Sequence, residues 1–406
     1  MEDNIIKKQR VLLVFINNQS QYDIDELTEL VKTADGEVVL TVNQNKEYLD
    51  KATVVGSGKL LEIASQVEAN DIDLVVFEET LSPIQLRNIQ EKIPCLVIDR
   101  TNLILDIFAM HASSAQGKIQ VELAQLKYNL PRLRSELGEL TRQGGGIGTR
   151  GPGETKLEVN KRKIKDRITF LNEKLREITK QRGVSRNNRM QNNVPIVALT
   201  GYTNAGKSTL FNFLTQANVL AENKLFATLD TTARKMSLNG VNVIFTDTVG
   251  FINNLPHGLI ESFKSTLEEI TYADLILDIV DISSSQHTLH QKVTEELLAE
   301  LGITSRIITV YNKCDLLMER FENTNDCVYI SALKNIGVEE LLKKIEEHIN
   351  QKYIDIVLTV PCDKLDILGL IQKFGTKTTM DYTEENVIIK TTIERIYLSK
   401  FEQYIK

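Results

Sequence analysis

A glycine-rich stretch near the middle of the chain combines small residues with one lysine and several hydroxyl side chains. The segment GYTNAGKST begins at Gly201 and satisfies the pattern G-x-x-x-x-G-K-[ST], between an apolar run and a helical one. Glycines let backbone N–H groups wrap phosphates at a helix N-terminus, Lys207 can reach the β- and γ-phosphates, and the Ser208 hydroxyl is suited to Mg²⁺. The loop residues expected to contact a nucleotide are Gly201, Tyr202, Thr203, Asn204, Ala205, Gly206, Lys207 and Ser208.

A second motif, NKCD, distinguishes between the purine bases. It follows the apolar run RIITVY and ends in Asp315. This carboxylate can accept from the N1–H and exocyclic N2–H of guanine together, whereas adenine offers no such donor pair. The nucleotide is therefore expected to be GTP or GDP. Asn312 should brace the loop, the Lys313 stem should lie across the base, and a backbone N–H should reach guanine O6. The residues expected on this side are Asn312, Lys313, Cys314, Asp315, Ser331, Ala332 and Leu333.

Between these motifs, DTVG follows the strand-like run VNVIFT and an Asn-Gly turn. Asp247 is expected to act on Mg²⁺ through water, and the Gly250 N–H to sense the γ-phosphate. Thr248 and Val249, between these two residues, are also expected to contact the nucleotide. A further magnesium ligand should be a threonine in FATLDTTAR, and spacing alone leaves three candidates open, which are Thr228, Thr231 and Thr232.

The residue after Gly250 bears on the rate of hydrolysis. Many GTPases place a water-orienting Gln there, but here the position is Phe251. A phenyl ring cannot orient water by hydrogen bonding. We therefore expect slow intrinsic hydrolysis that is stimulated by a partner.

The elements that must position these motifs can be read from hydrophobic periodicity. Apolar runs at 11–17, 37–42, 73–78 and 95–99 alternate with helical patterns at 24–33, 59–69 and 83–91, which predicts a mainly parallel N-terminal α/β domain. Beyond residue 354 the pattern is strand–helix–strand–strand–helix. The expected fold class is α/β, a P-loop GTPase domain with this N-terminal domain, a helical-hairpin linker and a small C-terminal α+β domain.

Two leucine and isoleucine seams with heptad spacing predict the antiparallel hairpin. The first runs from Ile119 to Leu140, where Pro131 is expected to kink the helix, and the second from Leu157 to Ile178. Residues 156–189 carry twelve Lys and Arg against four Asp and Glu, a net charge of +8, which favours contact with a polyanion. Their continuation, 182–193, is expected to be an irregular linker.

Two other glycine-rich segments are weaker signals. The loop GGGIGTRG, at 144–151, formally matches a dinucleotide fingerprint, but it follows a helix rather than a strand, so we reject that interpretation. Its glycines beside Arg142 and Arg150 favour close approach to phosphate or to the nucleotide domain, with a flexible connector as the alternative. GSGK at 56–59 resembles a phosphate loop but has Thr53 where the first glycine is required.

Composition is that of an ordinary soluble protein. The 406 residues are 42% hydrophobic and 25% charged, with a net charge of −7. Four widely spaced cysteines indicate reduced thiols in a cytoplasmic protein rather than disulfides or a zinc site. We interpret His287 and His290 as an exposed helix face rather than a metal site. No apolar run is long enough to span a membrane, so no stable membrane association is expected.

With these motifs in view, the chain resembles the HflX family of ribosome-associated GTPases over roughly residues 10 to 350. The resemblance is carried by VGSGK (55–59), LSPIQLRNIQ (81–90), VIDRTNLILDIFAMHA (97–112), GKIQVELAQLKY (117–128), GGIGTRGPGETKLE (145–158), FATLD (226–230) and DTVGF (247–251). The GPGE segment beside the helical hairpin is specific to the family. The G motifs are not.

The resemblance implies a hydrophobically substituted G domain at 194–352, after an α/β domain at 1–115 and a hairpin with its linker at 116–193, and before a small domain at 353–406. It makes Thr228 the preferred magnesium ligand, with Ser208 and Asp247. Lys207, Thr228 and Gly250 are then the catalytic residues, and Phe226, Ala227, Thr228, Leu229 and Asp230 join the nucleotide contacts. TTAR at 231–234 departs from the family where a proline is expected, and the tail is found in only some members.

The resemblance also implies binding to the large ribosomal subunit and its rRNA, and splitting of stalled or idle ribosomes under stress. Hydrolysis would permit release, and we expect a monomer. A different class remains open, a regulatory GTPase switch acting on a non-ribosomal protein partner. A third hypothesis, a second nucleotide bound by the N-terminal domain, has only 56–59 in its favour.

Overall fold

The computed structural model describes residues 8–17, 20–133, 156–191, 194–216, 225–226, 231–238, 241–253, 267, 269–318, 321–362, 366–383 and 386–405. The chain divides into two compact units. The first contains residues 1–178, 222–230 and 253–265, and the second contains residues 179–221, 231–252 and 266–406.

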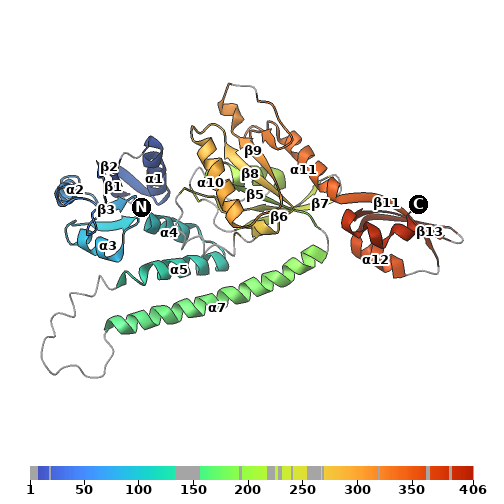
Figure 1. Cartoon of the computed structure of the whole chain (residues 1–406), viewed down its shortest axis with the longest axis horizontal. Helices are drawn as coiled ribbons and strands as arrows, with labels where there is room; N and C mark the ends of the chain where they lie inside the picture. The colour runs from blue at the N-terminus through green and yellow to red at the C-terminus, as the bar shows by residue number, and fades with distance from the viewer. Residues whose placement is uncertain are drawn as a thin grey trace, which may run out of the picture. The chain divides into compact units, whose positions relative to one another are not determined.

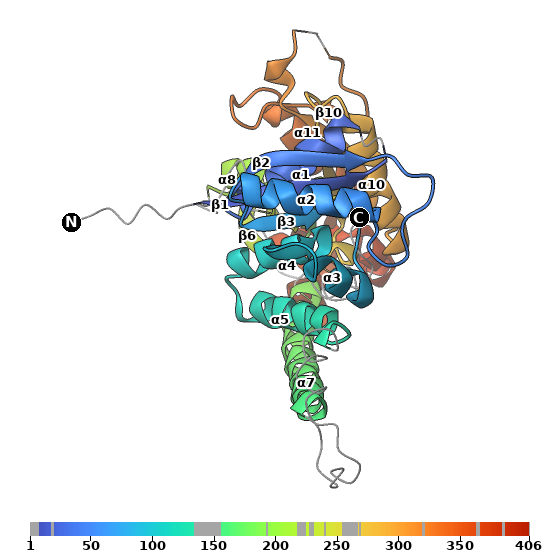
Figure 2. The ribbon, with the colours of Figure 1, turned by 90° about the vertical axis from the view of Figure 1, so that its left-hand side faces the viewer.

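The first unit is built on a four-stranded parallel sheet with the strand order β2-β1-β3-β4. Its strands are β1 (Gln9–Ile16), β2 (Gly36–Gln44), β3 (Leu74–Phe77) and β4 (Leu96–Asp99), and the helices between and after them are α1 (Gln21–Thr33), α2 (Ser57–Ala69), α3 (Pro83–Gln90) and α4 (Arg100–His111). The central strands are buried without alternation, as expected when helices cover both faces (Figure 2). The predicted N-terminal α/β domain is thereby confirmed.

The helical hairpin follows this sheet. Helix α5 (Ala115–Asn129) packs on α4, and α7 (Lys156–Gln191) runs beside α5 (Figure 1). Arg167 of α7 donates to both carboxylate oxygens of Glu122 on α5, at 2.7 and 2.9 Å. In the second seam Leu171 is buried, and the other described seam residues, Ile164, Ile168, Leu175 and Ile178, are half-buried. The seam therefore faces inward as predicted. The glycine-rich loop lies outside the described residues.

The two predictions about these helices have different outcomes. Helix α5 ends at Asn129, residues 130–132 form a turn and residue 133 is helical again, so the helix is interrupted at Pro131 as predicted, and the residues after 133 lie outside the described part. Proline lacks the N–H that would donate within the helix, although Leu130 before it keeps helical dihedrals of φ −52° and ψ −45°. The prediction of an irregular linker is wrong for residues 182–191, which are helical, because each added residue extends an existing helix by one hydrogen bond without a new nucleation step.

The second unit contains a six-stranded sheet in the order β10-β9-β8-β5-β7-β6. Its strands are β5 (Ile196–Gly201), β6 (Thr232–Leu238), β7 (Val241–Asp247), β8 (Leu275–Asp281), β9 (Arg306–Asn312) and β10 (Cys327–Tyr329). All pairs are parallel except the β6–β7 hairpin. Helices α8 (Lys207–Thr215), α10 (His287–Glu300) and α11 (Val338–Lys352) accompany the sheet, and Phe211, Phe245 and Leu277 lie in its core.

The chain ends in a small antiparallel sheet, ordered β11-β13-β12, with its own apolar core. It consists of β11 (Tyr353–Pro361), α12 (Asp366–Phe374), β12 (Gly375–Tyr382), β13 (Asn386–Glu394) and two short 3₁₀ helices, η2 (Arg395–Lys400) and η3 (Glu402–Tyr404). The predicted order is correct except that 3₁₀ turns replace the last helix. The fold class is thus confirmed, and no helix of the described residues could cross a membrane.

Candidate nucleotide-binding site

The glycine-rich loop leaves the carboxyl end of β5, in the middle of the six-stranded sheet, and enters α8. Gly201 has φ +137°, and a Cβ there would lie 2.2 Å from the Ile279 carbonyl oxygen. Gly206 has φ +93°, and a Cβ there would lie 2.3 Å from Asn312 Nδ2. Both the backbone conformation and the crowding exclude other residues, so the two motif glycines are required by the packing of this loop.

Lys207 is buried beneath this loop. Its Nζ donates to the carbonyl oxygens of Gly201 and Tyr202, at 3.1 and 2.7 Å. Burial lowers the pKa of Lys207 to about 8, and the carboxylates of Asp247 and Asp278 oppose that shift. The lysine is therefore held within the loop that should receive the phosphates.

The two predicted magnesium ligands that the structure describes lie together. Ser208 Oγ donates to Asp247 Oδ2 at 2.8 Å, across the space between α8 and the end of β7. Thr248 Oγ1 donates to the Leu199 carbonyl at 2.7 Å and so ties the segment after β7 to β5. A hydroxyl and a carboxylate are hard oxygen donors of the kind that Mg²⁺ prefers.

The segment after Asp247 continues alongside the glycine-rich loop. Thr203 donates its backbone N–H to the Phe251 carbonyl at 2.7 Å, and Phe251 donates to the Gly201 carbonyl at 3.1 Å. Gly250 is so close that a Cβ there would lie 2.9 Å from Lys207 Nζ. The Phe251 side chain is buried, which agrees with its having no role in orienting water.

Asn312 joins the two loops that were predicted to hold opposite ends of the nucleotide. Its Nδ2 donates to the Ala205 carbonyl at 2.9 Å, and its Oδ1 accepts from the Ala332 N–H at 3.0 Å. A backbone N–H of residues 331–333 was expected to face guanine O6, and of these the Ala332 N–H is used by Asn312. Exposed Leu333 follows in the same loop.

Two charged residues that the sequence did not bring forward pair with the side chains predicted to hold the guanine base. Asp281, at the end of β8, pairs with Lys313 at 2.7 Å, and Lys313 itself has φ +63°. Asp315, in the 3₁₀ turn η1 (Cys314–Leu316), pairs with Lys334 at 3.0 Å. A hydrogen bond from Ser331, followed by that from Lys334, lowers the pKa of Asp315 below its ordinary value. Two features of the sequence could have pointed to these residues. Asp281 directly follows a predicted strand, and Lys334 directly follows Ser-Ala-Leu.

The predicted switch segment is described only in part. Phe226 belongs to the first unit, where its ring meets that of Phe108 edge-on with centroids 4.7 Å apart. Thr232 begins β6, after Thr231. Ala227, Thr228, Leu229 and Asp230 lie outside the described residues.

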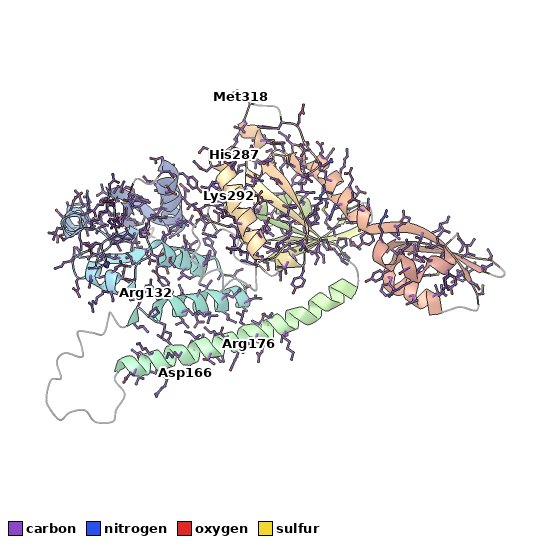
Figure 3. The ribbon with its side chains drawn as sticks, viewed as in Figure 1. Arg132, Asp166, Arg176, His287, Lys292 and Met318 are labelled. Atoms are coloured by element: carbon purple, nitrogen blue, oxygen red, sulfur yellow. The ribbon has the colours of Figure 1, made fainter. Side chains whose placement is uncertain are left out.

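His290 corrects one expectation, because it is only 8% exposed and not part of an exposed face. Its ring stacks on Tyr202 of the glycine-rich loop, with centroids 4.0 Å apart. Figure 3 shows His287 and Lys292 on the same helix, α10. Among the described residues no cluster of His, Cys, Asp or Glu could hold a metal by itself, and the four cysteines are free.

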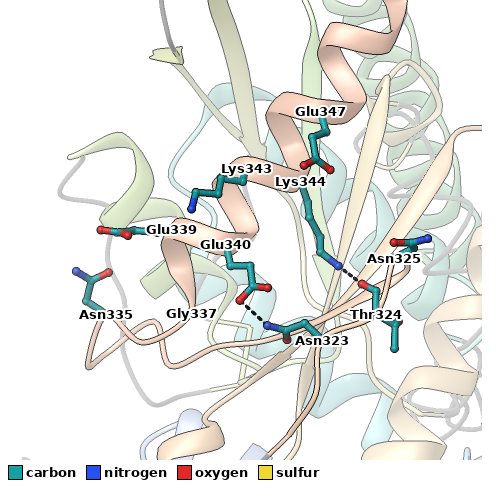
Figure 4. Close-up of a pocket in the computed structure, with 10 residues that line it drawn as sticks. All are labelled: Asn323, Thr324, Asn325, Asn335, Gly337, Glu339, Glu340, Lys343, Lys344 and Glu347. Atoms are coloured by element: carbon teal, nitrogen blue, oxygen red, sulfur yellow. Dashed lines mark hydrogen bonds between the residues drawn. The ribbon is translucent and has the colours of Figure 1, made fainter.

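A polar hollow of about 690 Å³ at the start of α11 lies apart from these motifs (Figure 4). Lys344 bonds to the carbonyl of Thr324, and Asn323 Nδ2 donates to Glu340 at 2.7 Å. None of the predicted nucleotide contacts lines it. In the first unit, residues 56–59 begin α2, where Lys59 pairs with Glu62, so they form a helix start rather than a phosphate loop.

The loops that follow β5, β7 and β9 lie at the carboxyl edge of one sheet, where parallel α/β folds bind ligands. In this sheet β5 and β7 are neighbours, and β8 separates β5 from β9. The class of protein that this arrangement defines is the P-loop GTPases. Family models described as "GTP-binding GTPase N-terminal", "GTP-binding GTPase Middle Region" and "50S ribosome-binding GTPase" match residues 21–109, 111–189 and 196–313. The chain belongs to the HflX family of GTPases.

Relatives named GTPase HflX support this assignment over nearly the whole chain. The protein of Caldanaerobacter subterraneus subsp. tengcongensis is 46% identical over 397 residues, covering 97% of this chain and 93% of the relative. That of Escherichia coli is 39% identical, covering 86% and 84%. A solved GTP-binding protein of Sulfolobus solfataricus in complex with GDP is 25% identical with a TM-score of 0.46, covering 84% of this chain and 99% of that chain.

Proposed function

We propose that this GTPase binds the large ribosomal subunit through rRNA and splits stalled or idle ribosomes under stress, with GTP hydrolysis as the switch for release. We also propose that the protein acts as a monomer in the cytoplasm. Support comes from the family model named for 50S binding, which covers residues 196–313 of this chain. The observation that carries the RNA contact is the exposed basic face of α7.

That face lies on the side of α7 away from its seam. Lys163, Lys165, Lys174, Arg176 and Lys180 are exposed, whereas the seam residues are buried or half-buried. Figure 3 shows Arg176 projecting from this helix, as Asp166 does. Asp166, Glu173 and Glu177 are exposed on the same helix, but its basic residues outnumber its acids. An excess of lysine and arginine releases counterions from a phosphate backbone, which favours RNA and makes the affinity dependent on salt.

Most of the proposed nucleotide contacts lie in the second unit, whereas Thr228 lies outside the described residues. Lys207 and the loop backbone would hold the phosphates, and Asp315 would hold guanine. Ser208 and Asp247, with Thr228, would hold Mg²⁺, which would neutralise charge on the β- and γ-phosphates. Because Phe251 cannot orient water, the fast reaction would depend on the bound subunit.

Two measurements test the proposal. GTP turnover should rise when purified large subunits are added, and it should vanish in Lys207→Ala. Co-sedimentation with the subunits should require GTP or a non-hydrolysable analogue and should weaken in Lys163→Gln/Lys165→Gln. The control, Lys292→Gln/Lys343→Gln, removes the same charge from exposed positions of the second unit. Turnover that responds to another protein but not to ribosomes would instead support a regulatory switch.

A further inference from the structure

The carboxylate predicted to recognise guanine already has a cationic partner within the chain. Lys334 Nζ lies 3.0 Å from Asp315 Oδ2. The Asp315 side chain is only 8% exposed, whereas that of Lys334 is 57% exposed. A carboxylate so far removed from water needs a donor, and the lysine supplies one while most of its own side chain remains hydrated.

Backbone contacts hold the two residues in register. Cys314 donates its N–H to the Ile330 carbonyl at 3.1 Å, which ties the turn containing Asp315 to the loop after β10. In that loop the Lys334 N–H donates to Ser331 Oγ at 3.2 Å. The backbone of Lys334 is therefore held near the Asp315 carboxylate, and only the flexible lysine side chain has to move for the ion pair to open.

The ammonium group and the guanine edge compete for the same acceptor. Guanine presents two N–H donors, and a bidentate contact uses both carboxylate oxygens. Lys334 uses Oδ2. A carboxylate oxygen has two lone pairs, and guanine makes its full contact at Oδ2 only in competition with the ammonium that already shares this atom.

We propose that Lys334 is a residue that sets guanine affinity and exchange, because its ammonium occupies the Asp315 carboxylate whenever the base is absent. The inference rests on the proposed role of Asp315 in guanine recognition. Because the lysine has to be displaced, the net free energy gained on nucleotide binding is smaller. When the lysine returns to the carboxylate, it assists departure of the guanine base. Lys334 thereby keeps the site exchangeable rather than tightly occupied.

The direction in which nucleotide affinity changes when Lys334 is replaced distinguishes this role from a general electrostatic attraction. Removing a cation near an anionic nucleotide ordinarily weakens binding. Here Lys334→Met, which keeps an apolar stem of similar length, should tighten binding of a fluorescent GDP and slow its release by roughly two- to ten-fold, the range expected for a charge-assisted pair that is partly exposed. The gain should shrink at high salt.

The test measures GDP dissociation constants and release rates for the unsubstituted protein and for Lys334→Met. Lys343→Met is the matched control, since this exposed lysine lies on α11 and not at Asp315. Binding by Lys334→Met that is unchanged, or weakened, would overturn the proposal.

A second background shows whether Lys334 acts through the carboxylate. In Asp315→Asn, xanthosine diphosphate replaces GDP as the probe and no carboxylate remains for the lysine, so adding Lys334→Met should change nothing. An equal gain in that background would also overturn the proposal. Failure of guanine recognition itself is detected separately, as an absence of preference for GDP over ADP in the unsubstituted protein.

Discussion

The ring of Tyr202 lies almost flat on the imidazole of His290, with centroids 4.0 Å apart and planes inclined by 15°. Tyr202 is the second residue of the glycine-rich loop, and its carbonyl accepts from Lys207 Nζ at 2.7 Å. Its neighbour Thr203 donates to Phe251. Helix α10 thus supports, through one aromatic pair, the loop that holds the lysine and the segment after β7.

Replacing His290 should therefore disturb catalysis without touching a nucleotide contact. We expect His290→Ala to lower the turnover of GTP by about three- to ten-fold, since a stacked pair contributes roughly 0.5–1.5 kcal/mol. His290→Phe keeps a ring in the stack and should retain most of the rate. Steady-state kinetics of both variants check this, and full activity in the alanine variant would show that the stack is not required.

Asp315→Asn should exchange guanine for xanthine preference, because the amide donates where the carboxylate accepted and xanthine offers an oxygen in place of the N2 amine. Loss of charged hydrogen bonds predicts a GDP affinity lower by roughly ten- to a hundred-fold. Calorimetry with GDP, XDP and ADP provides the measurement. Undiminished GDP binding in this variant would contradict a role for Asp315 in base recognition.

Ser208→Ala should remove the benefit of magnesium for GTP binding. The hydroxyl lies 2.8 Å from Asp247 and is a proposed ligand, so the variant should bind a GTP analogue about equally well with Mg²⁺ and with EDTA. Ser208→Thr keeps a hydroxyl and is the control. If the alanine variant responds to magnesium as the unsubstituted protein does, Ser208 is not a ligand.

The buried carboxyl of Asp278 on β8 predicts a pH dependence of stability. Burial raises the pKa of Asp278 from 3.8 to about 7, Glu295 adds to the shift, and Lys207 opposes it. Because this folded-state pKa is raised, the contribution to stability is present below about pH 4 and is lost as the pH rises to about 7.

The isosteric variant Asp278→Asn should therefore gain stability relative to the unsubstituted protein between pH 5 and 7.5, by about 1–2 kcal/mol. Denaturant unfolding at the two pH values gives the comparison. The exposed Asp381→Asn is the control. A gain that is the same at both pH values would mean that Asp278 does not titrate in this range.

The elements that the sequence predicted well are those whose information is local. The apolar runs in β1 and β3 and the glycine-rich loop before α8 can each be read within about a dozen residues. The error in the linker arose where local signals compete, because helix propagation carried α7 through a polar stretch.

The sequence by itself determined the chemistry of this protein, since glycines, one lysine and one aspartate at set spacings specify which groups can meet a guanine nucleotide. Tertiary structure alone decided which other side chains support them. Asp281 reaches Lys313, Lys334 reaches Asp315, and His290 reaches Tyr202. The last two partners lie 19 and 88 positions apart, and they meet because parallel strand order and turn geometry, which depend on non-local pairing and packing, bring loops from separate elements to one edge of a sheet.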